Sequence, residues 1–262
     1  MEKHKILNIE LLNIELPSLL QQLERGVLIT PNVDHLMKLQ KDRGFYELYR
    51  KTEWIICDSN IVQLALRFLG NPVRQVIPGS TFFPAYCAHH KDHEHIRLFL
   101  LGAAPGIAAK AAENINRKAG RSMVVAAHSP SYGFEKNEAE CLDIVDKVNA
   151  SGATVLVVGV GAPKQEKWIF AYKELMPNIQ VFMALGATID FEAGTLQRAP
   201  RWVQKLSMEW LYRLLKEPRR LWKRYMVDDL PFFYLILKAK MGRYRDPFSG
   251  NIAPRHLTST TR

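Results

Sequence analysis

A carboxylate and several polar side chains directly follow short apolar runs of the sequence, where an enzyme could mount reactive groups. Asp58 comes directly after the run WIIC at 54–57. A general base must reach the hydroxyl proton that it removes, and the rigid end of a strand is a suitable mount for it. The same spacing fits an N-cap of a helix that begins one or two residues later, and spacing alone favours this plainer interpretation. Thr30, Asn32 and Asp34 in the segment TPNVDH leave the same choice open.

Two glycine-containing loops, LLGAAPG at 100–106 and VVGVGAPKQE at 157–166, also follow apolar runs. A glycine lets backbone N–H groups approach a phosphate, and the N-terminus of a following helix adds favourable charge. The glycines concerned are Gly102, Gly159 and Gly161. Neither loop has the spacing of a dinucleotide-binding or Walker loop, and glycines at strand ends also serve packing. Lys164, Gln165 and Glu166 could open the next helix and face a ligand, or serve as ordinary polar residues at a helix start.

Histidines and cysteines give no metal site. The segment HHKDHEH at 89–95 is charged, is expected to be a surface linker and has no partner ligands at recognisable spacing, so we reject a metal there. The three cysteines, Cys57, Cys87 and Cys141, fit no C-x-x-C pattern and indicate reduced thiols in a cytoplasm. We expect neither a signal peptide nor a membrane span, because no uncharged apolar run approaches about 18 residues.

The net charge of +10 is concentrated near the C-terminus. Residues 1–200 hold 22 Lys and Arg against 21 Asp and Glu, whereas residues 201–262 hold 14 against 5. This asymmetry indicates a polyanionic partner, either nucleic acid or an anionic lipid surface. The basic segment includes Arg213, Arg220 and Arg224, interleaved with Trp and Tyr. Guanidinium groups suit phosphate and aromatic rings suit a membrane interface, although a solvated helical face is the plainer alternative. We expect a hydrophobic anchor in Phe232, Phe233, Leu235, Ile236 and Leu237.

Short apolar runs alternate with amphipathic stretches from about Val27 to Asp190, which predicts strand-helix repeats around a parallel sheet. Six strands are expected in GVLITPN, WIICDSN, IRLFLLGAAPG, SMVVAAHSP, ATVLVVGVGAPKQE and IQVFMALGATID. Ligands bind beyond the carboxyl ends of the strands in such sheets, so Asp190 joins the candidate residues. After Asp190 the spacing is helical, the cations are dense and no further strand is expected.

These patterns predict an α/β fold, a Rossmann-like parallel sheet flanked by helices, with a basic helical C-terminal appendage that suits a polyanionic partner, a membrane surface being one of the two candidates. The α/β core is expected at 1–195, the basic amphipathic helical appendage at 196–245 and a disordered tail at 246–262.

An ordered set of motifs runs through nearly the whole chain. It comprises TPNVDH, the strand-end Asp58, IPGSTF, FLLGAAPG, VGVGAPKQE, GATIDFEAGTLQRAP and MEWLYRLLKEPRRLWKRY. Together these segments resemble the WecG/TagA/CpsF glycosyltransferases over about residues 5 to 245. The two patterns G-A-x-x-D-F-x-A-G-x-x-x-R-A-P and E-W-x-x-R-L-x-x-E-P-x-R are long and distinctive.

The resemblance implies an inverting hexosyltransferase that needs no metal and no cofactor. Such an enzyme moves a sugar from a UDP-sugar onto an undecaprenyl-diphosphate-linked saccharide, in cell-surface polysaccharide or exopolysaccharide biosynthesis. It would lie on the inner face of the bacterial plasma membrane as a peripheral protein, with its anionic lipid surface as a partner and a homo-oligomer left open. N-acetylmannosamine, its uronate and glucose all remain possible donor sugars.

The resemblance also implies roles for individual residues. Asp58 is expected to be the general base, and Thr30 and Asn32 to line the pocket. The G-x-G-A-P-K-Q-E loop, with Gln165, is expected to contact the nucleotide sugar. That loop includes Gly159, Gly161 and Lys164, while Gly102 and Asp190 are expected to bind substrate from their positions after strands. The arginines expected to meet the diphosphates are Arg213, Arg220 and Arg224. One departure stands beside the base, because Ser59 occupies a position where the family often has glycine.

Two other classes of protein compete with this interpretation. A nucleic-acid-binding protein would use the basic segment on RNA, but the charges share their segment with Leu, Phe and Trp stripes and no recognised nucleic-acid module is present. We therefore expect no nucleic-acid partner. The other alternative is a nucleotide-dependent enzyme on a soluble acceptor, in which the C-terminal segment acts only in oligomerisation.

Overall fold

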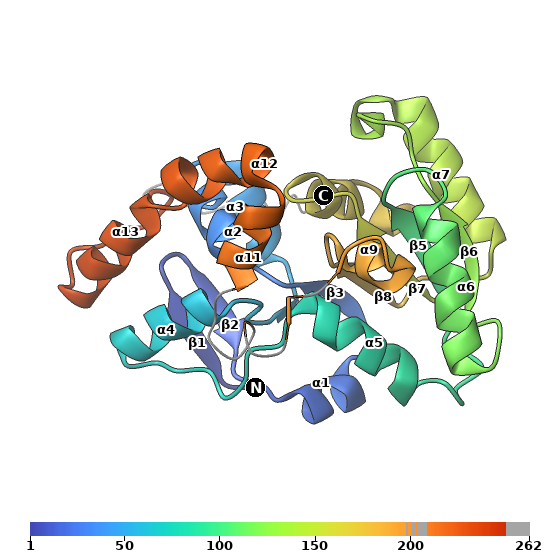
Figure 1. Ribbon diagram of the computed structural model, residues 1–262, viewed down its shortest axis with the longest axis horizontal. Coiled ribbons are helices and arrows are strands. Elements are labelled where there is room, and N and C mark those ends of the chain that lie inside the picture. Colours follow the sequence, from blue (N-terminus) through green and yellow to red (C-terminus); the bar gives the residue numbers. More distant parts are fainter. Residues whose placement is uncertain (198, 201–202, 204–208, 250–262) are drawn as a thin grey trace, which may run out of the picture.

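The computed structural model describes residues 1–197, 199–200, 203 and 209–249. Its centre is a six-stranded sheet in the order β4-β3-β8-β7-β5-β6, with every neighbouring pair parallel (Figure 1). The strands are β3 (Gly26–Ile29), β4 (Trp54–Ile55), β5 (Leu98–Gly102), β6 (Val124–His128), β7 (Val155–Gly159) and β8 (Val181–Ala184). Each lies in one of the six predicted segments, so the predicted Rossmann-like α/β fold is confirmed.

The sheet is buried on both faces, which explains why its strands are continuous apolar runs rather than alternating ones. Along β5, Leu98 and Leu100 point into one layer of the core, while Phe99 and Leu101 point into the other. Strand β7 is buried at every position. Successive side chains of a strand face opposite sides, so a single run supplies both layers of the core.

Helices cover both faces of the sheet. On one face, the core contains side chains from α2 (Val33–Lys38), α3 (Arg43–Arg50), α4 (Asn60–Leu69), α7 (Glu138–Ala150), α8 (Lys164–Tyr172) and α13 (Pro231–Lys240). On the other face, it contains side chains from α1 (Leu16–Gln22), α5 (Gly79–His89), α6 (Ile107–Ala119) and α9 (Thr188–Ala193). Two short 3-10 segments, η1 (Phe134–Lys136) and η2 (Lys173–Leu175), complete the core region.

An N-terminal hairpin, which the sequence analysis did not predict, joins the helices on the first face. Strands β1 (Lys3–Ile6) and β2 (Ile9–Leu12) pair antiparallel outside the main sheet. Ile6 and Leu11 are fully buried, and the side-chain amide of Asn8 donates to the carbonyl of Leu39 at 2.8 Å. The hairpin therefore packs as part of the core.

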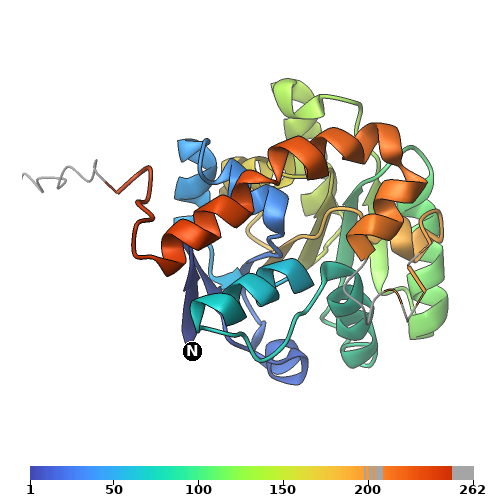
Figure 2. The same ribbon diagram turned by 60° about the vertical axis from the view of Figure 1, so that its left-hand side comes forward.

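The C-terminal segment crosses the molecule as α11 (Glu209–Lys216), α12 (Pro218–Lys223), the π-helical turn η3 (Arg224–Asp228) and α13 (Figure 2). Beyond β8 the described residues form helices and loops only, as the helical spacing predicted. Helix α13 packs on α2 and α4. None of the described helices has the length and apolar character needed to cross a bilayer.

The expected hydrophobic anchor divides into two sets of side chains. Phe232 and Ile236 are buried in the core, whereas Phe233 and Leu237 are exposed. The first two therefore hold α13 on the protein, and the expectation that all five apolar residues face a membrane is wrong. At the start of the expected tail, residues 246–249 are described, and the Tyr46 hydroxyl donates to Asp246 at 3.1 Å. Residues 250–262 of that tail lie outside the described part of the chain.

Candidate active site

A cavity of about 1590 Å³ opens at the carboxyl end of the sheet. Loops after β3, β4, β7 and β8 line it, together with parts of α4, α9, η3 and α13. This is the edge at which ligands bind in open α/β sheets. Its volume exceeds the roughly 300–1,000 Å³ typical of a pocket for one small ligand, so there is room for two substrates. The predicted site residues that line it are Thr30, Asn32, Asp58, Gly159, Gly161, Gln165, Asp190 and Arg224.

Gly102 and Lys164 do not line this cavity. A Cβ atom on Gly102 would lie 2.5 Å from the carbonyl oxygen of Gly159, so this glycine lets the ends of β5 and β7 pack backbone to backbone. That is the plainer of the two roles considered for a strand-end glycine. Lys164 pairs with Glu135 at 3.4 Å and covers the ring of Tyr132. Ligand binding by Gly102 and Lys164 stays a prediction.

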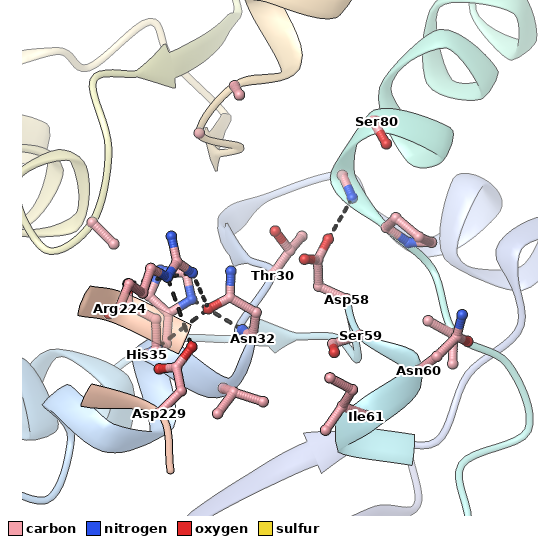
Figure 3. A pocket seen from close by; sticks show the side chains of 18 of the residues that line it. Thr30, Asn32, His35, Asp58, Ser59, Asn60, Ile61, Ser80, Arg224 and Asp229 are labelled. Carbon is pink, nitrogen blue, oxygen red and sulfur yellow. Dashed lines mark hydrogen bonds and ion pairs between the residues drawn. The ribbon is translucent and has the colours of Figure 1, made fainter. Parts of the chain in front are cut away.

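Asp58 lies at the wall of the cavity, two residues before α4 begins. The backbone N–H of Gly79 donates to Asp58 Oδ1 at 2.9 Å (Figure 3). Gly79 is the first residue of α5, so the positive end of that helix faces the carboxylate. The N-cap position of α4 belongs to Ser59, whose side chain makes no capping hydrogen bond. Asp58 therefore lies one residue before the N-cap position of α4, and its carboxylate is held by the first residue of α5.

The departure from the family pattern at Ser59 leaves the backbone unstrained. Ser59 has φ −127° and ψ 131°, an extended conformation that any residue adopts. A glycine is not required at this position, and the loop that carries Asp58 keeps an ordinary shape.

Thr30 and Asn32 follow β3 and lie on the same side of the cavity as Asp58 (Figure 3). Asn32 caps α2, since its Oδ1 accepts from the N–H of His35 at 3.3 Å. In return, the N–H of Asn32 donates to His35 Nδ1 at 3.1 Å. An Nδ1 that accepts places the proton of a neutral imidazole on Nε2. Burial keeps His35 neutral by lowering its pKa to about 3.

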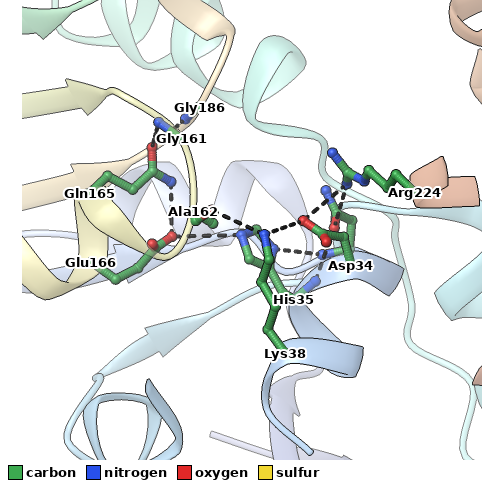
Figure 4. Close-up of polar contacts among 10 residues, drawn as sticks. Asp34, His35, Lys38, Gly161, Ala162, Gln165, Glu166, Gly186 and Arg224 are labelled. Atoms are coloured by element: carbon green, nitrogen blue, oxygen red, sulfur yellow. Dashed lines mark hydrogen bonds and ion pairs between the residues drawn. The ribbon is translucent and has the colours of Figure 1, made fainter. Parts of the chain in front are cut away.

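A chain of buried contacts joins three of the strand-end loops (Figure 4). Gln165 Oε1 accepts from the N–H groups of Gly161 and Gly186, both at 3.2 Å, which ties the loops after β7 and β8 together. Gln165 Nε2 donates to Glu166 Oε1 at 2.9 Å, and this oxygen lies 3.7 Å from His35 Nε2 beside the β3 loop. Gln165 thus holds the glycine loops in place with both ends of its carboxamide.

Glu166 is fully buried, and burial raises its pKa to about 7. Its second oxygen has no hydrogen-bond partner within the described residues. A carboxyl group kept partly neutral at neutral pH can both accept from Gln165 and remain in an apolar surrounding. Sequence reasoning placed Glu166 at the helix start but did not find its contact with His35. The only hint in the sequence was that His35 and Glu166, both titratable, each follow a strand-end loop.

Arg224 brings the C-terminal segment to the β3 loop. Its Nη2 donates to Asn32 Oδ1 at 3.2 Å and lies 3.5 Å from Asp34 Oδ2, while its Nε lies 3.9 Å from Asp229 Oδ2. Burial raises the pKa of Asp229 to about 6, and the neighbouring guanidinium opposes that rise. Lys38 also pairs with Asp34 at 2.8 Å. The structure therefore places one predicted arginine at the cavity, held between two carboxylates.

The other two predicted arginines cannot be placed in the same way. Arg213 belongs to α11 and Arg220 to α12, but their side chains lie outside the described part of the structure. Among the described residues, no group of three or more His, Cys, Asp or Glu side chains could hold a metal ion. All three cysteines are free and buried.

This fold and site define a Rossmann-like α/β enzyme with a strand-end carboxylate beside a wide cavity. The chain belongs to the WecG/TagA/CpsF family of glycosyl transferases, whose family model matches residues 4–246. The resemblance found in the motifs is therefore confirmed.

Two curated relatives carry the name N-acetylglucosaminyldiphosphoundecaprenol N-acetyl-β-D-mannosaminyltransferase. The protein from Bacillus spizizenii is 26% identical over 240 residues, which cover 91% of this chain and 90% of that protein. The protein from Bacillus subtilis strain 168 is 26% identical over 251 residues, which cover 93% of this chain and 94% of the relative.

Proposed function

We propose that this glycosyltransferase moves a sugar from a UDP-sugar onto a saccharide linked to undecaprenyl diphosphate, with inversion at the anomeric carbon. The observation that carries the proposal is Asp58, oriented by Gly79 at the wall of a cavity with room for two substrates. The names of the two Bacillus relatives support a lipid-diphosphate acceptor. N-acetylmannosamine, its uronate and glucose are the proposed donor sugars, with N-acetylmannosamine favoured by those names.

In the proposed reaction, Asp58 takes the proton of the acceptor hydroxyl as its oxygen attacks the anomeric carbon. The new C–O bond forms on the face opposite the departing UDP, so the C–O bond to the diphosphate breaks and the configuration inverts. Attack by the bound acceptor oxygen, with its proton passing to a fixed carboxylate, gains from the orientation of both groups. The bond from Gly79 keeps the carboxylate in that orientation before the acceptor arrives.

Negative charge accumulates on the diphosphate as UDP leaves, and preorganised positive groups stabilise that transition state. Arg224 is the described arginine at the cavity, and we assign it this role together with Arg213 and Arg220. Helix α8 begins at the glycine loop after β7, so its N-terminus adds favourable charge at the same edge. These groups would serve in place of a divalent cation, so we propose a metal-independent enzyme.

The C-terminal segment is proposed to hold the enzyme on the inner, anionic surface of the plasma membrane. Residues 201–262 carry 14 Lys and Arg against 5 Asp and Glu, and each cation near an anionic surface contributes about 1 kcal/mol before salt screening. Docking keeps the enzyme and its lipid acceptor in one plane and raises the effective concentration of the acceptor.

A UDP-release screen tests the proposed function. The wild-type enzyme is mixed with single UDP-sugars, each with and without N-acetylglucosamine diphosphate on a short alkyl chain. We expect release from at least one donor, and only when the sugar-diphosphate acceptor is present. Equal release with a free saccharide acceptor would favour the soluble-acceptor alternative, and a gel shift with RNA but no release from any donor would favour the nucleic-acid alternative.

A further inference from the structure

The cavity at the strand ends has a second, apolar part that the proposed chemistry does not use. Its walls are Ile61, Leu64 and Phe68 of α4 and Phe233 and Leu237 of α13. Leu64, Phe68 and Phe233 are 56%, 50% and 58% exposed. Large apolar side chains that are exposed together and line a concavity mark a binding site for an apolar ligand.

This apolar part begins beside the proposed base. Helix α4 starts two residues after Asp58, and the spacing of positions 61, 64, 65 and 68 places their side chains on one stripe of the helix. A rise of 1.5 Å per residue makes the stripe about 10 Å long from Ile61 to Phe68. The stripe therefore leads away from the carboxylate over a length that fits a few isoprene units.

Helix α13 forms the facing wall and is fixed in place. It packs on α4 and α2, and its side chains Phe232 and Ile236 are buried in the core. Figure 2 shows the course of the C-terminal segment across the molecule. Because these two side chains fix the helix, Phe233 and Leu237 are presented to the cavity from a rigid element. Two other apolar residues of the C-terminal segment, Tyr234 and Met241, are equally exposed but do not line the cavity. Tyr234 and Met241 share the i, i+3, i+7 stripe of α13 with Leu237, so they extend the exposed apolar surface of the segment beyond the cavity.

Charges mark both ends of the apolar part. Arg224 lies at the polar end, in the turn that leads into α13. Lys240 places its ammonium group 5.4 Å from the ring centre of Phe68, at the end of the α4 stripe farthest from Asp58. A guanidinium suits a diphosphate, and lysines at an apolar edge suit an anionic lipid surface.

We propose that the walls formed by α4 and α13 bind the isoprene units that adjoin the diphosphate of the acceptor. The inference rests on the proposed function, because it takes the acceptor to be a polyprenyl diphosphate. The lining runs from carboxylate and guanidinium to apolar side chains, and such an acceptor runs from sugar and diphosphate to isoprenoid. The acceptor thus matches the polar-to-apolar order of the lining, beside the donor in the same cavity. The occupant is a single lipid chain drawn out of the bilayer, so the exposed Tyr234 and Met241 beyond the cavity are left for contact with the bilayer itself.

The test uses two acceptors that are both soluble in water, so that membrane docking plays no part. One is N-acetylglucosamine diphosphate with a methyl ester, and the other carries a chain of two isoprene units. Wild-type KM is expected to be about tenfold lower for the prenyl acceptor. Burial of the isoprene units removes about as much apolar surface from water as burial of one large apolar side chain, which contributes about 1.4 kcal/mol or more. In Leu64→Ser/Phe68→Ser this preference is lost, while kcat and KM for the methyl acceptor stay unchanged.

The matched control is Tyr234→Ser/Met241→Ser, which removes the apolar surface outside the cavity. It is expected to keep the tenfold preference and to lose co-sedimentation with anionic vesicles that contain no acceptor, whereas the α4 variant keeps vesicle binding. Leu237→Ser tests the facing wall independently should the α4 double variant lose its circular-dichroism spectrum. A wild-type enzyme with equal KM for the two acceptors would overturn the inference, as would an α4 variant that loses vesicle binding and retains the preference. In both of those cases, transfer to the methyl acceptor would still support the proposed function. The proposed function itself fails if neither acceptor is glycosylated.

Discussion

Arg224 donates a hydrogen bond to the side-chain oxygen of Asn32 at 3.2 Å, although 192 positions separate the two residues in the chain. Asn32 ends the loop after β3 and caps α2, so the bond ties the C-terminal segment to the strand-end site. Together with the buried Phe232, it makes this segment a wall of the cavity. Any role of the segment at a membrane is therefore coupled to the shape of the site.

Asp58→Asn is expected to lower kcat by about a hundredfold to ten-thousandfold, because that is the usual cost of losing a general base. The amide keeps the size of the side chain, and its oxygen can still accept from Gly79, so binding of the UDP-sugar should change little. Initial-rate kinetics and calorimetric titration of the donor measure the two effects. Asp143→Asn on α7, where Asp143 pairs with Lys147 at the surface, is the control. Near-normal turnover of folded Asp58→Asn would exclude Asp58 as the base.

Arg224→Ala is expected to depress kcat on a short-chain soluble acceptor, where membrane docking is irrelevant. Loss of a positive group that stabilises a developing negative charge costs about a hundredfold or more in rate. Arg224→Lys should recover part of the rate, since it keeps the charge but not the fork of donors. Arg219→Ala on the exposed side of α12 should have no effect. Full activity of Arg224→Ala on this acceptor would reduce the C-terminal segment to a docking element.

The sequence predicted the sheet well because its physical signal is local. Each parallel strand is a continuous apolar run that ends in polar residues or glycine. In β7 every position is buried, and the strand ends at Gly159. The hairpin β1–β2 was missed because its connection, Leu7-Asn8, contains no glycine, and Leu7 adopts a φ of 52° that leucine rarely takes.

The site residues that directly follow strands could also be predicted from this local signal. Asp58, Thr30 and Asn32 follow strands, so their position at the sheet edge was available from the sequence. The contact between His35 and Glu166 was not, because it joins residues 131 positions apart and depends on burial that composition does not report. The neighbours Phe232 and Phe233 are chemically identical and both line the cavity, and only the packing of α13 buries the first and leaves the second exposed.

Glu166→Gln is expected to change how the stability of the protein depends on pH. Burial raises the pKa of Glu166 from 4.5 to about 7, so between these values the folded protein binds more protons than the unfolded chain. Stability linked to this group is therefore present below pH 4.5 and is lost as the pH rises through 7. The variant cannot ionise at this position, so it avoids the loss. The Tm of the variant minus the Tm of wild type should therefore be larger at pH 8 than at pH 5.

Thermal unfolding of both proteins at a series of pH values measures this difference. Glu174→Gln, which changes a carboxylate that is 85% exposed, is the control and should give a difference that does not depend on pH. A Tm difference for Glu166→Gln that stays constant from pH 5 to 8 would contradict a raised pKa at this site.

EDTA is expected to leave the rate of transfer unchanged. No group of three or more potential metal ligands occurs among the described residues, and the described cations that line the cavity are Arg224 and Lys38. Rates are compared before and after chelation and dialysis, with each candidate UDP-sugar. Activity that falls on chelation and returns with Mg²⁺ or Mn²⁺ would show that a cation neutralises the leaving diphosphate.

Phe232→Ala and Phe233→Ala form a matched pair that tests how the C-terminal segment is built into the fold. Phe232 is fully buried in the core, so its truncation should cost about 3–5 kcal/mol of unfolding free energy and lower the Tm by many degrees. Phe233 is 58% exposed and lines the cavity, so its truncation should change stability by about 0.5 kcal/mol or less. Urea unfolding at one pH measures both values. If the segment were only a membrane anchor that rests loosely on the core, the two variants would be equally stable and would lose vesicle binding to the same extent. Two neighbouring phenylalanines with unequal effects on stability are therefore the expected sign that α13 belongs to the catalytic fold.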